Sequence, residues 1–168
     1  MDTKEISKPI DGFPTYEITN YGRVFNSYSG REMSLSPTLY GDLTVGMMHD
    51  RVQHRRSVKV MVARAFVEGE TEEFDTPILL DGNRENLQAS NIVWRPRWFA
   101  WEYTRQFHHT FDWFFDKPVI DITTDTIYES IFSAATTNGN LCKDIRMSTI
   151  DERRVFPTRE IYNLYTLP

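Results

Sequence analysis

The chain has 168 residues, a length that suits one compact domain or two small ones. Hydrophobic residues make up 40% of it and aromatic residues 14%, which is enough for a substantial core and excludes a disordered chain. The formal net charge is −5, whereas a nucleic-acid-binding chain is usually basic, so any contact with nucleic acid must rest on local basic patches.

Cysteine content and hydropathy limit the cellular compartment that we expect for this protein. The single cysteine, Cys142, excludes an internal disulfide and a cysteine-rich zinc site. No apolar segment has the length of a signal peptide or a membrane span. We therefore expect a soluble protein of a reducing cytoplasm.

Residues 9–48 have the pattern of short strands separated by turns. Segments 16–19 and 43–45 have strand composition. Turn dipeptides recur at intervals of about ten residues, namely Asp11-Gly12, Tyr21-Gly22, Ser29-Gly30 and Tyr40-Gly41. This spacing predicts a small antiparallel N-terminal sheet.

The next part of the chain changes to helical periodicity. Apolar residues of segment 58–66 follow helical spacing, with Lys59 and Arg64 off the apolar stripe. An acidic loop, 68–73, leads to the apolar run 78–80 and the turn 81–83. We expect a short helix over 86–94, with Leu87 and Ile92 inward, and a helix over 98–115, which lacks Gly and Pro.

The last fifty residues have the pattern of a separate unit. Segments 119–122 and 126–128 predict a hairpin, and 130–135 predicts a helix that Gly139-Asn140 ends. A second helix near 141–147 and a return strand at 155–156 complete it. The division expected is 1–57, 58–116 and 117–168.

The segment from Ile10 to Val24 carries a resemblance. It reads Ile-Asp-Gly-Phe-Pro-Thr-Tyr-Glu-Ile-Thr-Asn-Tyr-Gly-Arg-Val and closely resembles the N-terminal module of phage and intron HNH homing endonucleases. Its residues also have structural roles, because Gly12 and Gly22 suit turns and Tyr16 and Val24 suit a core. Scaffold and binding roles remain open for this segment.

The HNH core of that family is matched in part. The family has a histidine before Leu-Val-Ala-x-Ala-Phe, where this chain has Lys59. It then has Asn/Asp-His-Ile-Asp-Gly-Asn and Glu-Asn-Leu-x-Trp, where this chain has 78–83 and Ser90-Asn91-Ile92-Val93-Trp94. The resemblance implies α+β architecture with a small antiparallel N-terminal sheet, a degenerate ββα-metal core, and a C-terminal hairpin with a helix-turn-helix-like module.

Two positions of that core decide the expected chemistry. The resemblance implies that a histidine activates water and that a divalent cation stabilises the phosphoryl charge. Ile78 stands at the ligand position and Leu79 at the base position, and neither can bind a hard cation or accept a proton. Asn91 is the only remnant of the family site. We expect a chain with no catalytic residue, no metal and no cofactor, hence not an enzyme.

Basic residues mark the candidate nucleic-acid contacts, because arginine makes forked phosphate contacts and tryptophan stacks on bases. They lie in the stretches 51–59 and 94–98, beside helix 58–66, and in the possible recognition helix of the C-terminal module. The candidates are Arg51, His54, Arg55, Arg56, Lys59, Arg64, Arg95, Arg97, Trp98, Lys143 and Arg146.

Three functions are open. The first is a phage-encoded, non-cleaving protein that binds DNA, structured RNA or a ribonucleoprotein such as the ribosome, in a host cytoplasm. The second is an active HNH endonuclease with an altered metal site. The third is an adaptor that inhibits a host protein, with the acidic loop as one contact.

Overall fold

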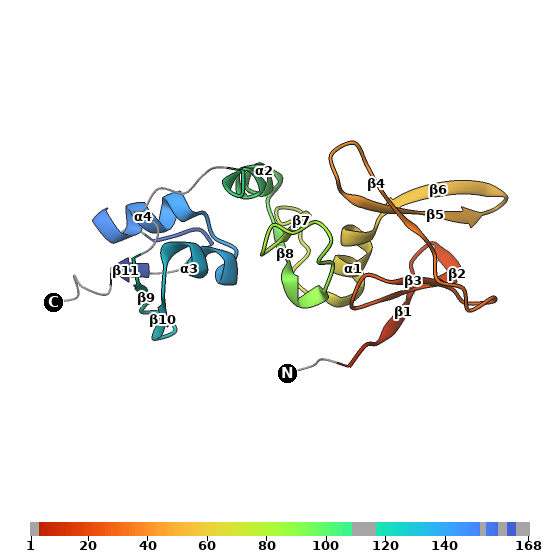
Figure 1. Ribbon diagram of the computed structural model, residues 1–168, viewed down its shortest axis with the longest axis horizontal. Coiled ribbons are helices and arrows are strands. Elements are labelled where there is room, and N and C mark those ends of the chain that lie inside the picture. Colours follow the sequence, from red (N-terminus) through yellow and green to blue (C-terminus); the bar gives the residue numbers. More distant parts are fainter. Residues whose placement is uncertain (1–3, 109–116, 152–153, 158–160, 164–168) are drawn as a thin grey trace. The chain divides into compact units, whose positions relative to one another are not determined.

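The chain folds as two compact units, Met1–Arg97 and Trp98–Pro168, in a computed structural model (Figure 1). The structure describes residues 4–108, 117–151, 154–157 and 161–163. The first unit contains both the N-terminal module and the HNH-like segment. Their expected division after residue 57, and the one after residue 116, stay predictions.

The first unit begins with two small antiparallel sheets, whereas the turn spacing predicted one, over residues 9–48. One has the strand order β1-β2-β3 and the other β4-β5-β6. Their bounds are β1 Ser7–Ile10, β2 Phe13–Thr19, β3 Val24–Asn26, β4 Leu35–Pro37, β5 Leu43–His49 and β6 Val52–Ser57. Strand β2 carries the centre of the matched N-terminal motif.

Helix α1, Val58–Phe66, follows β6 directly and confirms the predicted helix. Its inward residues, Val58, Val62 and Ala63, are buried, whereas Arg64 is exposed. Strands β7, Thr76–Leu79, and β8, Ile92–Arg95, then form a two-stranded antiparallel sheet. The unit therefore combines two three-stranded sheets, a helix and a hairpin-like pair of strands.

The prediction of a helix over 86–94 is wrong. That segment holds only a short 3-10 turn, Ala89–Asn91, before β8 begins. Ile92-Val93-Trp94 is β-branched and aromatic, and these residues prefer the pleated, half-buried surface of a strand. Pairing of Ile92 with Leu79 and of Val93 with Ile78 fixes that conformation. The expected burial of Leu87 and Ile92 is confirmed.

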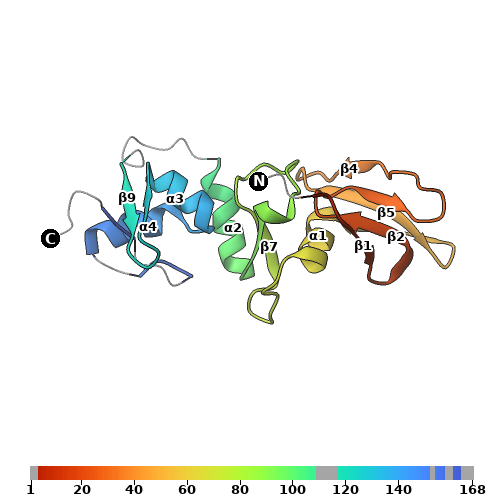
Figure 2. The same ribbon diagram turned by 90° about the horizontal axis from the view of Figure 1, so that it is seen from below.

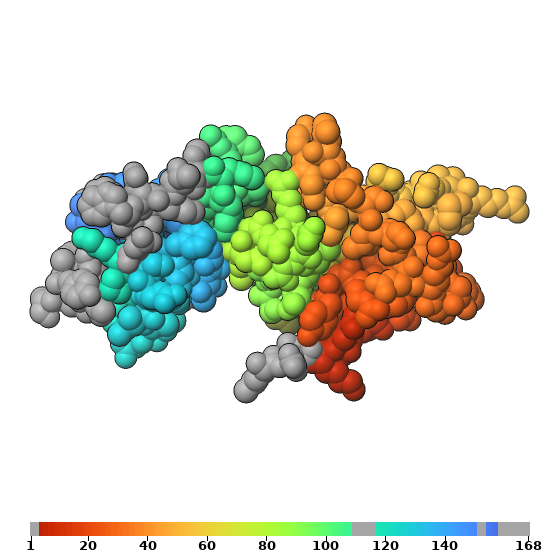
Figure 3. Space-filling view, in the orientation of Figure 1, coloured from red at the N-terminus to blue at the C-terminus, as the bar shows by residue number. Residues whose placement is uncertain are grey.

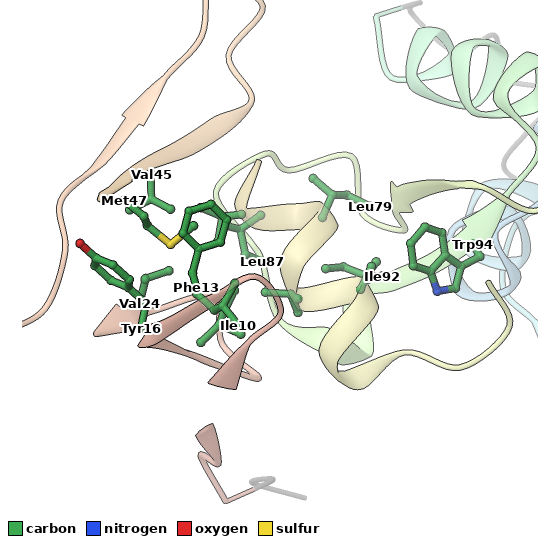
Figure 4. Close-up of a cluster of buried hydrophobic side chains, with 14 residues drawn as sticks. Ile10, Phe13, Tyr16, Val24, Val45, Met47, Leu79, Leu87, Ile92 and Trp94 are labelled. Carbon is green, nitrogen blue, oxygen red and sulfur yellow. The ribbon is translucent and has the colours of Figure 1, made fainter. Parts of the chain in front are cut away.

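One core joins the elements of the first unit, as Figure 4 shows. The cluster includes Tyr16 and Val24 from the first sheet, Met47 from the second, Val62 from α1 and Leu79 from β7. Tyr16 is 4% exposed and Val24 is fully buried, so both core positions predicted from the motif are confirmed.

The matched motif also contains a position that only glycine can occupy without strain. Gly22 has φ +83°, in the left-handed region, and a Cβ there would lie 2.5 Å from Leu87 Cβ. Nearby, the backbone carbonyl of Asn20 accepts a hydrogen bond from the backbone N–H of Ala89. The motif thus holds the first sheet against segment 87–89, and this role is structural.

The second unit contains a three-stranded antiparallel sheet of order β10-β9-β11 and helices from three parts of the chain. The bounds are α2 Arg97–Gln106, β9 Val119–Asp121, β10 Thr126–Tyr128, α3 Ile131–Asn138, α4 Cys142–Asp151 and β11 Ile161–Asn163. The predicted hairpin and both predicted helices are confirmed. Figure 2 shows β9 beside α3 and α4.

Two expectations in this unit need correction or restriction. Of the return strand expected at 155–156, Val155 makes a β-bridge, whereas Phe156 and Pro157 form a turn. The strand that extends the sheet is β11, which pairs with β9. Proline cannot donate to a strand ladder, so Pro157 does not continue the strand. Of the helix expected over 98–115, α2 covers the first part, and residues 109–116 lie outside the described residues.

The architecture is α+β, with small antiparallel sheets and helices, as predicted. Helix α3 ends at Gly139, which has a left-handed φ of 66°, and α4 begins three residues later. None of the helices among the described residues has the length and apolarity to cross a membrane.

Candidate nucleic-acid interface

Strands β5 and β6 form a hairpin, called here the ribbon and comprising residues 43–57. Its turn residues Asp50 and Arg51 have φ values of 50° and 65°, both in the left-handed region. A two-residue turn with positive φ at both positions matches the right-handed twist of the flanking strands. In Figure 3 the tip of the ribbon stands out from the surface of the first unit.

The ribbon is attached to the motif strand by a tyrosine. The backbone N–H of Met48 donates to the Tyr16 hydroxyl at 3.0 Å. Tyr16 lies in β2 and is itself buried. The motif therefore positions the ribbon as well as filling the core.

Pairing along the ribbon places its basic residues on two faces. His54 lies opposite Met47 and Arg56 opposite Val45, and both of these partners are buried. Arg55 lies opposite Gly46 instead. Because side chains alternate along a strand, Arg55 belongs to the other, open face.

The inner face of the ribbon is an aromatic and cationic cluster around Phe13. The Arg56 guanidinium lies 5.5 Å from the centre of the Phe13 ring. The rings of His54 and His49 contact the same phenylalanine edge-on, at 5.6 Å and 5.8 Å. Phe13, which sequence reasoning assigned no contact role, is the residue that organises this face.

The open face carries positive charge and one exposed apolar side chain, Met48. Arg51 at the tip, Gln53 and Arg55 are exposed. A Cβ on Gly46 would lie 2.6 Å from Gln53 Nε2, so the glutamine amide lies over this glycine. Asp50 is the only acidic residue between 43 and 57. The open face can therefore present donors to an anionic surface.

Two further candidates of the first unit are partly neutralised. Lys59 Nζ lies 3.6 Å from the carboxylate of Asp42. Arg64 Nε donates to Glu70 at 3.2 Å, although the arginine side chain stays 66% exposed. Both residues lie on α1, next to the inner face of the ribbon.

The second basic stretch does not form one patch. Arg95 is buried, 9% exposed, and its Nη1 donates to the carbonyl of Trp94 at 2.8 Å. Arg97 is exposed and lies 3.5 Å from Asp75. Trp98 is 59% exposed, and its ring contacts Phe99 and Phe156. Burial of Arg95 leaves it unable to reach phosphate as the structure stands.

The C-terminal candidates lie on α4 in the second unit. Lys143 donates to Glu102 of α2, which neutralises much of its charge. Arg146 is exposed on the next turn. These two residues belong to a different unit from the ribbon.

The HNH positions Ile78 and Leu79 lie in β7 and are 3% and 8% exposed. The side chain of Leu79 belongs to the core of the first unit, with Ile92 as its partner across the strands (Figure 4). An aliphatic side chain at either position offers no oxygen or nitrogen ligand.

Asn91 is engaged in holding the turn 81–83. Its Oδ1 accepts from the backbone N–H of Asp81 at 3.1 Å, and its Nδ2 donates to Asp81 Oδ1 and to the carbonyl of Asn86. The Asp81 carboxylate also accepts from the Asn83 backbone and from Asn86 Nδ2. The polar side chains of this turn therefore hydrogen-bond to one another and to its backbone.

These residues do not fit the divalent cation that the HNH family implies. Such a cation needs several oxygen ligands, and the carboxylate of this turn already accepts three hydrogen bonds. In the part of the chain that the structure describes, no cluster of three or more His, Cys, Asp or Glu could hold a metal.

Comparison with known proteins places this geometry in context. An uncharacterized HNH endonuclease of Acanthamoeba polyphaga mimivirus is 25% identical over 125 residues, which is 73% of this chain. The chain spans 31% of that protein's length. A solved structure on DNA binding and cleavage by the HNH homing endonuclease I-HmuI matches 94% of this chain and 97% of its own, with a TM-score of 0.56 and 21% identity.

No family model matches the chain. The two matches nevertheless support the relationship to HNH endonucleases that the motifs indicated, and the structural match shows the shared fold. They also correct one expectation. We expected a chain that is not an enzyme, and this is opposed by the finding that both matched proteins are endonucleases.

Proposed function

We propose that this relative of the HNH homing endonucleases binds duplex DNA and that the ribbon is its principal contact. The observation that carries the proposal is the open face of the ribbon, where Arg51, Gln53 and Arg55 are exposed together. The major groove of B-DNA admits a two-stranded β-ribbon. The I-HmuI structure, which shares the fold, concerns DNA binding.

The three side chains suit different parts of a duplex. Arginine makes charge-assisted, forked contacts with phosphate, and Arg51 at the tip and Arg55 on the strand supply two such groups. A glutamine amide can pair with both polar atoms of an adenine edge, which is the contact that Gln53 offers. Phosphate contacts then orient the ribbon and Gln53 reads sequence.

Duplex DNA is favoured over the other nucleic acids. The major groove of an RNA duplex is deep and narrow, and side chains cannot read it. A ribbon that carries its contacts along two paired strands matches the wide groove of B-DNA instead. This geometry also gives no role to the acidic loop 68–73, so it favours DNA over a host protein as the partner.

The test compares binding to a labelled DNA duplex, a DNA single strand and an RNA hairpin by fluorescence anisotropy. Arg55→Ala is expected to weaken duplex binding by about tenfold, equivalent to about 1.4 kcal/mol. The matched control is Arg31→Ala, which removes an exposed arginine outside the ribbon. Tighter binding to the hairpin than to the duplex, or equal losses in both variants, would contradict the proposal.

Cleavage of DNA is the second candidate function, and the observation that favours it is that both matched proteins are endonucleases. Ile78 and Leu79 stand at the family's ligand and base positions, and their aliphatic side chains can neither bind a hard cation nor accept a proton. Loss of a general base slows a reaction by about 10²–10⁴-fold. We therefore expect slow nicking, well below the rate of an enzyme that keeps its histidine.

Nicking of supercoiled plasmid with Mg²⁺ or Mn²⁺ measures this activity. The unaltered chain is compared with Asp81→Ala, which removes the carboxylate of turn 81–83, and with Glu85→Ala, an exposed control in the following segment. Nicking that is lost only with Asp81→Ala assigns cleavage to this turn. Absence of nicking above a mock preparation would contradict the second candidate.

A further inference from the structure

A pocket of about 360 Å³ lies in the first unit between the motif strands, the end of the ribbon and α1. Six of its apolar lining residues are together called the floor here, and its charged lining residues are called the rim. The floor residues are Ile10, Phe13, Ile18, Val60, Met61 and Ala65. Ligand pockets in proteins begin at about 300 Å³, so this one suits a single small molecule. Four residues of the matched motif line it, Ile10, Asp11, Phe13 and Ile18, but the ribbon contact proposed above does not use it.

The rim of the pocket carries opposed charges with arginine in excess. Arg56 reaches it from the ribbon and Arg64 from α1, whereas Asp11 is the only acid among the described residues that line it. Lys8 adds a third cation close by, with its Nζ donating to the carbonyl of Ala65 at 2.6 Å. An anionic group at the rim would therefore meet cations from three elements, of which Arg64 is shared with Glu70.

Apolar floor and cationic rim together select the class of ligand. A purely apolar molecule would make no use of the guanidinium groups, and inorganic phosphate has no use for the floor. A planar ring with an attached phosphate uses both. Phe13 also lines the pocket, 7% exposed and with the Arg56 guanidinium over its ring. Aromatic and apolar side chains are the usual neighbours of a nucleobase held outside its stack.

We propose that the pocket between β1, β2, β6 and α1 binds a nucleotide, with its base on the floor and its phosphate at Arg56 and Arg64. The inference deepens the proposed function and rests on it for the identity of the ligand. Arg56 connects the two sites, because it lies on the inner face of the ribbon and also lines the pocket. The nucleotide can be free in solution or unstacked from bound DNA.

Methyl resonances give direct reporters of the free-nucleotide source. The full chain, labelled with ¹³C at the isoleucine and methionine methyl groups, is titrated with dAMP, dGMP, dCMP and dTMP. Saturable shifts are expected at Ile10, Ile18 and Met61, and none at Met147 in the second unit. Inorganic phosphate at the same concentration is expected to leave the three reporters unchanged; equal shifts with phosphate would overturn the proposal.

A variant that fills the pocket distinguishes nucleotide binding in the pocket from nonspecific shifts of the methyl resonances. Ala65→Leu adds bulk to the floor from a helical position where leucine is well tolerated, and is expected to weaken nucleotide binding by about tenfold or more. Ala89→Leu is the matched control, since Ala89 is also half-buried against the core but lies outside the pocket. Thermal melts of both variants confirm that they fold. Equal affinity in Ala65→Leu and Ala89→Leu overturns the site.

The second arm tests DNA as the source. Duplexes that carry 2-aminopurine at successive positions brighten when that base leaves the stack. A rise with the unaltered chain that is lost in Ala65→Leu assigns the nucleotide to bound DNA. Binding of mononucleotides without any rise assigns it to solution. No saturable mononucleotide binding and no rise overturns the inference.

The two proposals can fail separately. Ala65→Leu leaves Arg51, Gln53 and Arg55 intact, so its affinity for an ordinary duplex is expected to match that of the unaltered chain. Duplex binding with an inert pocket contradicts only the nucleotide site. Nucleotide binding to the pocket by a chain that does not bind duplex DNA contradicts only the proposed function.

Discussion

Gly22 shows how a residue of the matched motif acts through the backbone. Its φ of +83° and the 2.5 Å approach that a Cβ would make to Leu87 Cβ are separate reasons for glycine. Gly12 offers a matched control, because it has φ +73° and a Cβ there would meet nothing within 4 Å. We expect Gly12→Ala to lower the free energy of unfolding by about 1 kcal/mol through strain alone.

Gly22→Ala is expected to cost clearly more than Gly12→Ala, because the same strain is joined by a clash with Leu87. Urea denaturation of both variants measures the difference between the two free energies of unfolding. Equal losses would show that segment 87–89 is not held against the motif as described.

Burial of Cys142 makes the free energy of unfolding depend on pH. Burial raises the pKa of its thiol from 9.0 to about 12. Since the folded chain disfavours the thiolate, the free energy of unfolding is highest below pH 9, and this contribution is lost as the pH rises toward 12.

The corresponding measurement follows reaction of Cys142 with a thiol reagent at neutral pH. The native chain is expected to react slowly and the urea-unfolded chain quickly, because only the thiolate is nucleophilic. Rapid reaction of the native chain would contradict the buried position of this residue.

At the scale of elements, a change in the turn of the ribbon is expected to affect stability and DNA affinity in opposite directions. Asp50 and Arg51 both occupy left-handed backbone, where Asn-Gly is preferred. Replacing the pair by Asn-Gly is expected to raise the free energy of unfolding by about 1 kcal/mol, since left-handed backbone strains most side chains. It also removes the arginine at the tip, so affinity for duplex DNA is expected to fall.

Stability by urea denaturation and affinity by anisotropy are measured on that one variant. A more stable chain that binds less tightly supports a direct contact of Arg51. Unchanged affinity would show that the tip of the ribbon does not meet DNA.

Elements with a clear period were predictable, and those fixed by their partners were not. The apolar stripe of 58–66 predicted α1 correctly, and the turn spacing predicted antiparallel strands over 9–48 but not their division into two sheets or strand β6. The prediction for segment 86–94 was wrong because pairing with β7 decides its conformation. The turn Asp50-Arg51 carries no sequence signal of the Asn-Gly kind, so the ribbon itself could not be foreseen.

The sequence predicted which stretch carries the basic residues of the candidate site, but not how their side chains are distributed over the surface. The run of basic residues from Arg51 to Lys59 was recognised, yet alternation on β6 divides it between an open face and the Phe13 face. Arg95, which the sequence grouped with Trp98, is buried. Burial of a single arginine depends on tertiary packing, which residue order does not reveal.

For the whole molecule, the net charge of −5 means that DNA binding must depend on local basic groups. Electrostatic attraction over a Debye length of about 8 Å at physiological salt is set by nearby groups, so a cationic ribbon can act on an acidic chain. Contacts with phosphate release counterions, and the logarithm of the affinity then falls linearly with the logarithm of the salt concentration.

The salt dependence of duplex binding is therefore the most direct test of the ribbon as the DNA contact. Each phosphate contact contributes about 0.9 to the slope, so Arg51→Ala/Arg55→Ala is expected to lower its magnitude by about 1.8, with Arg31→Ala leaving it unchanged. An unchanged slope in the double variant, measured by anisotropy over a range of salt, would contradict the assignment of the ribbon as the DNA contact.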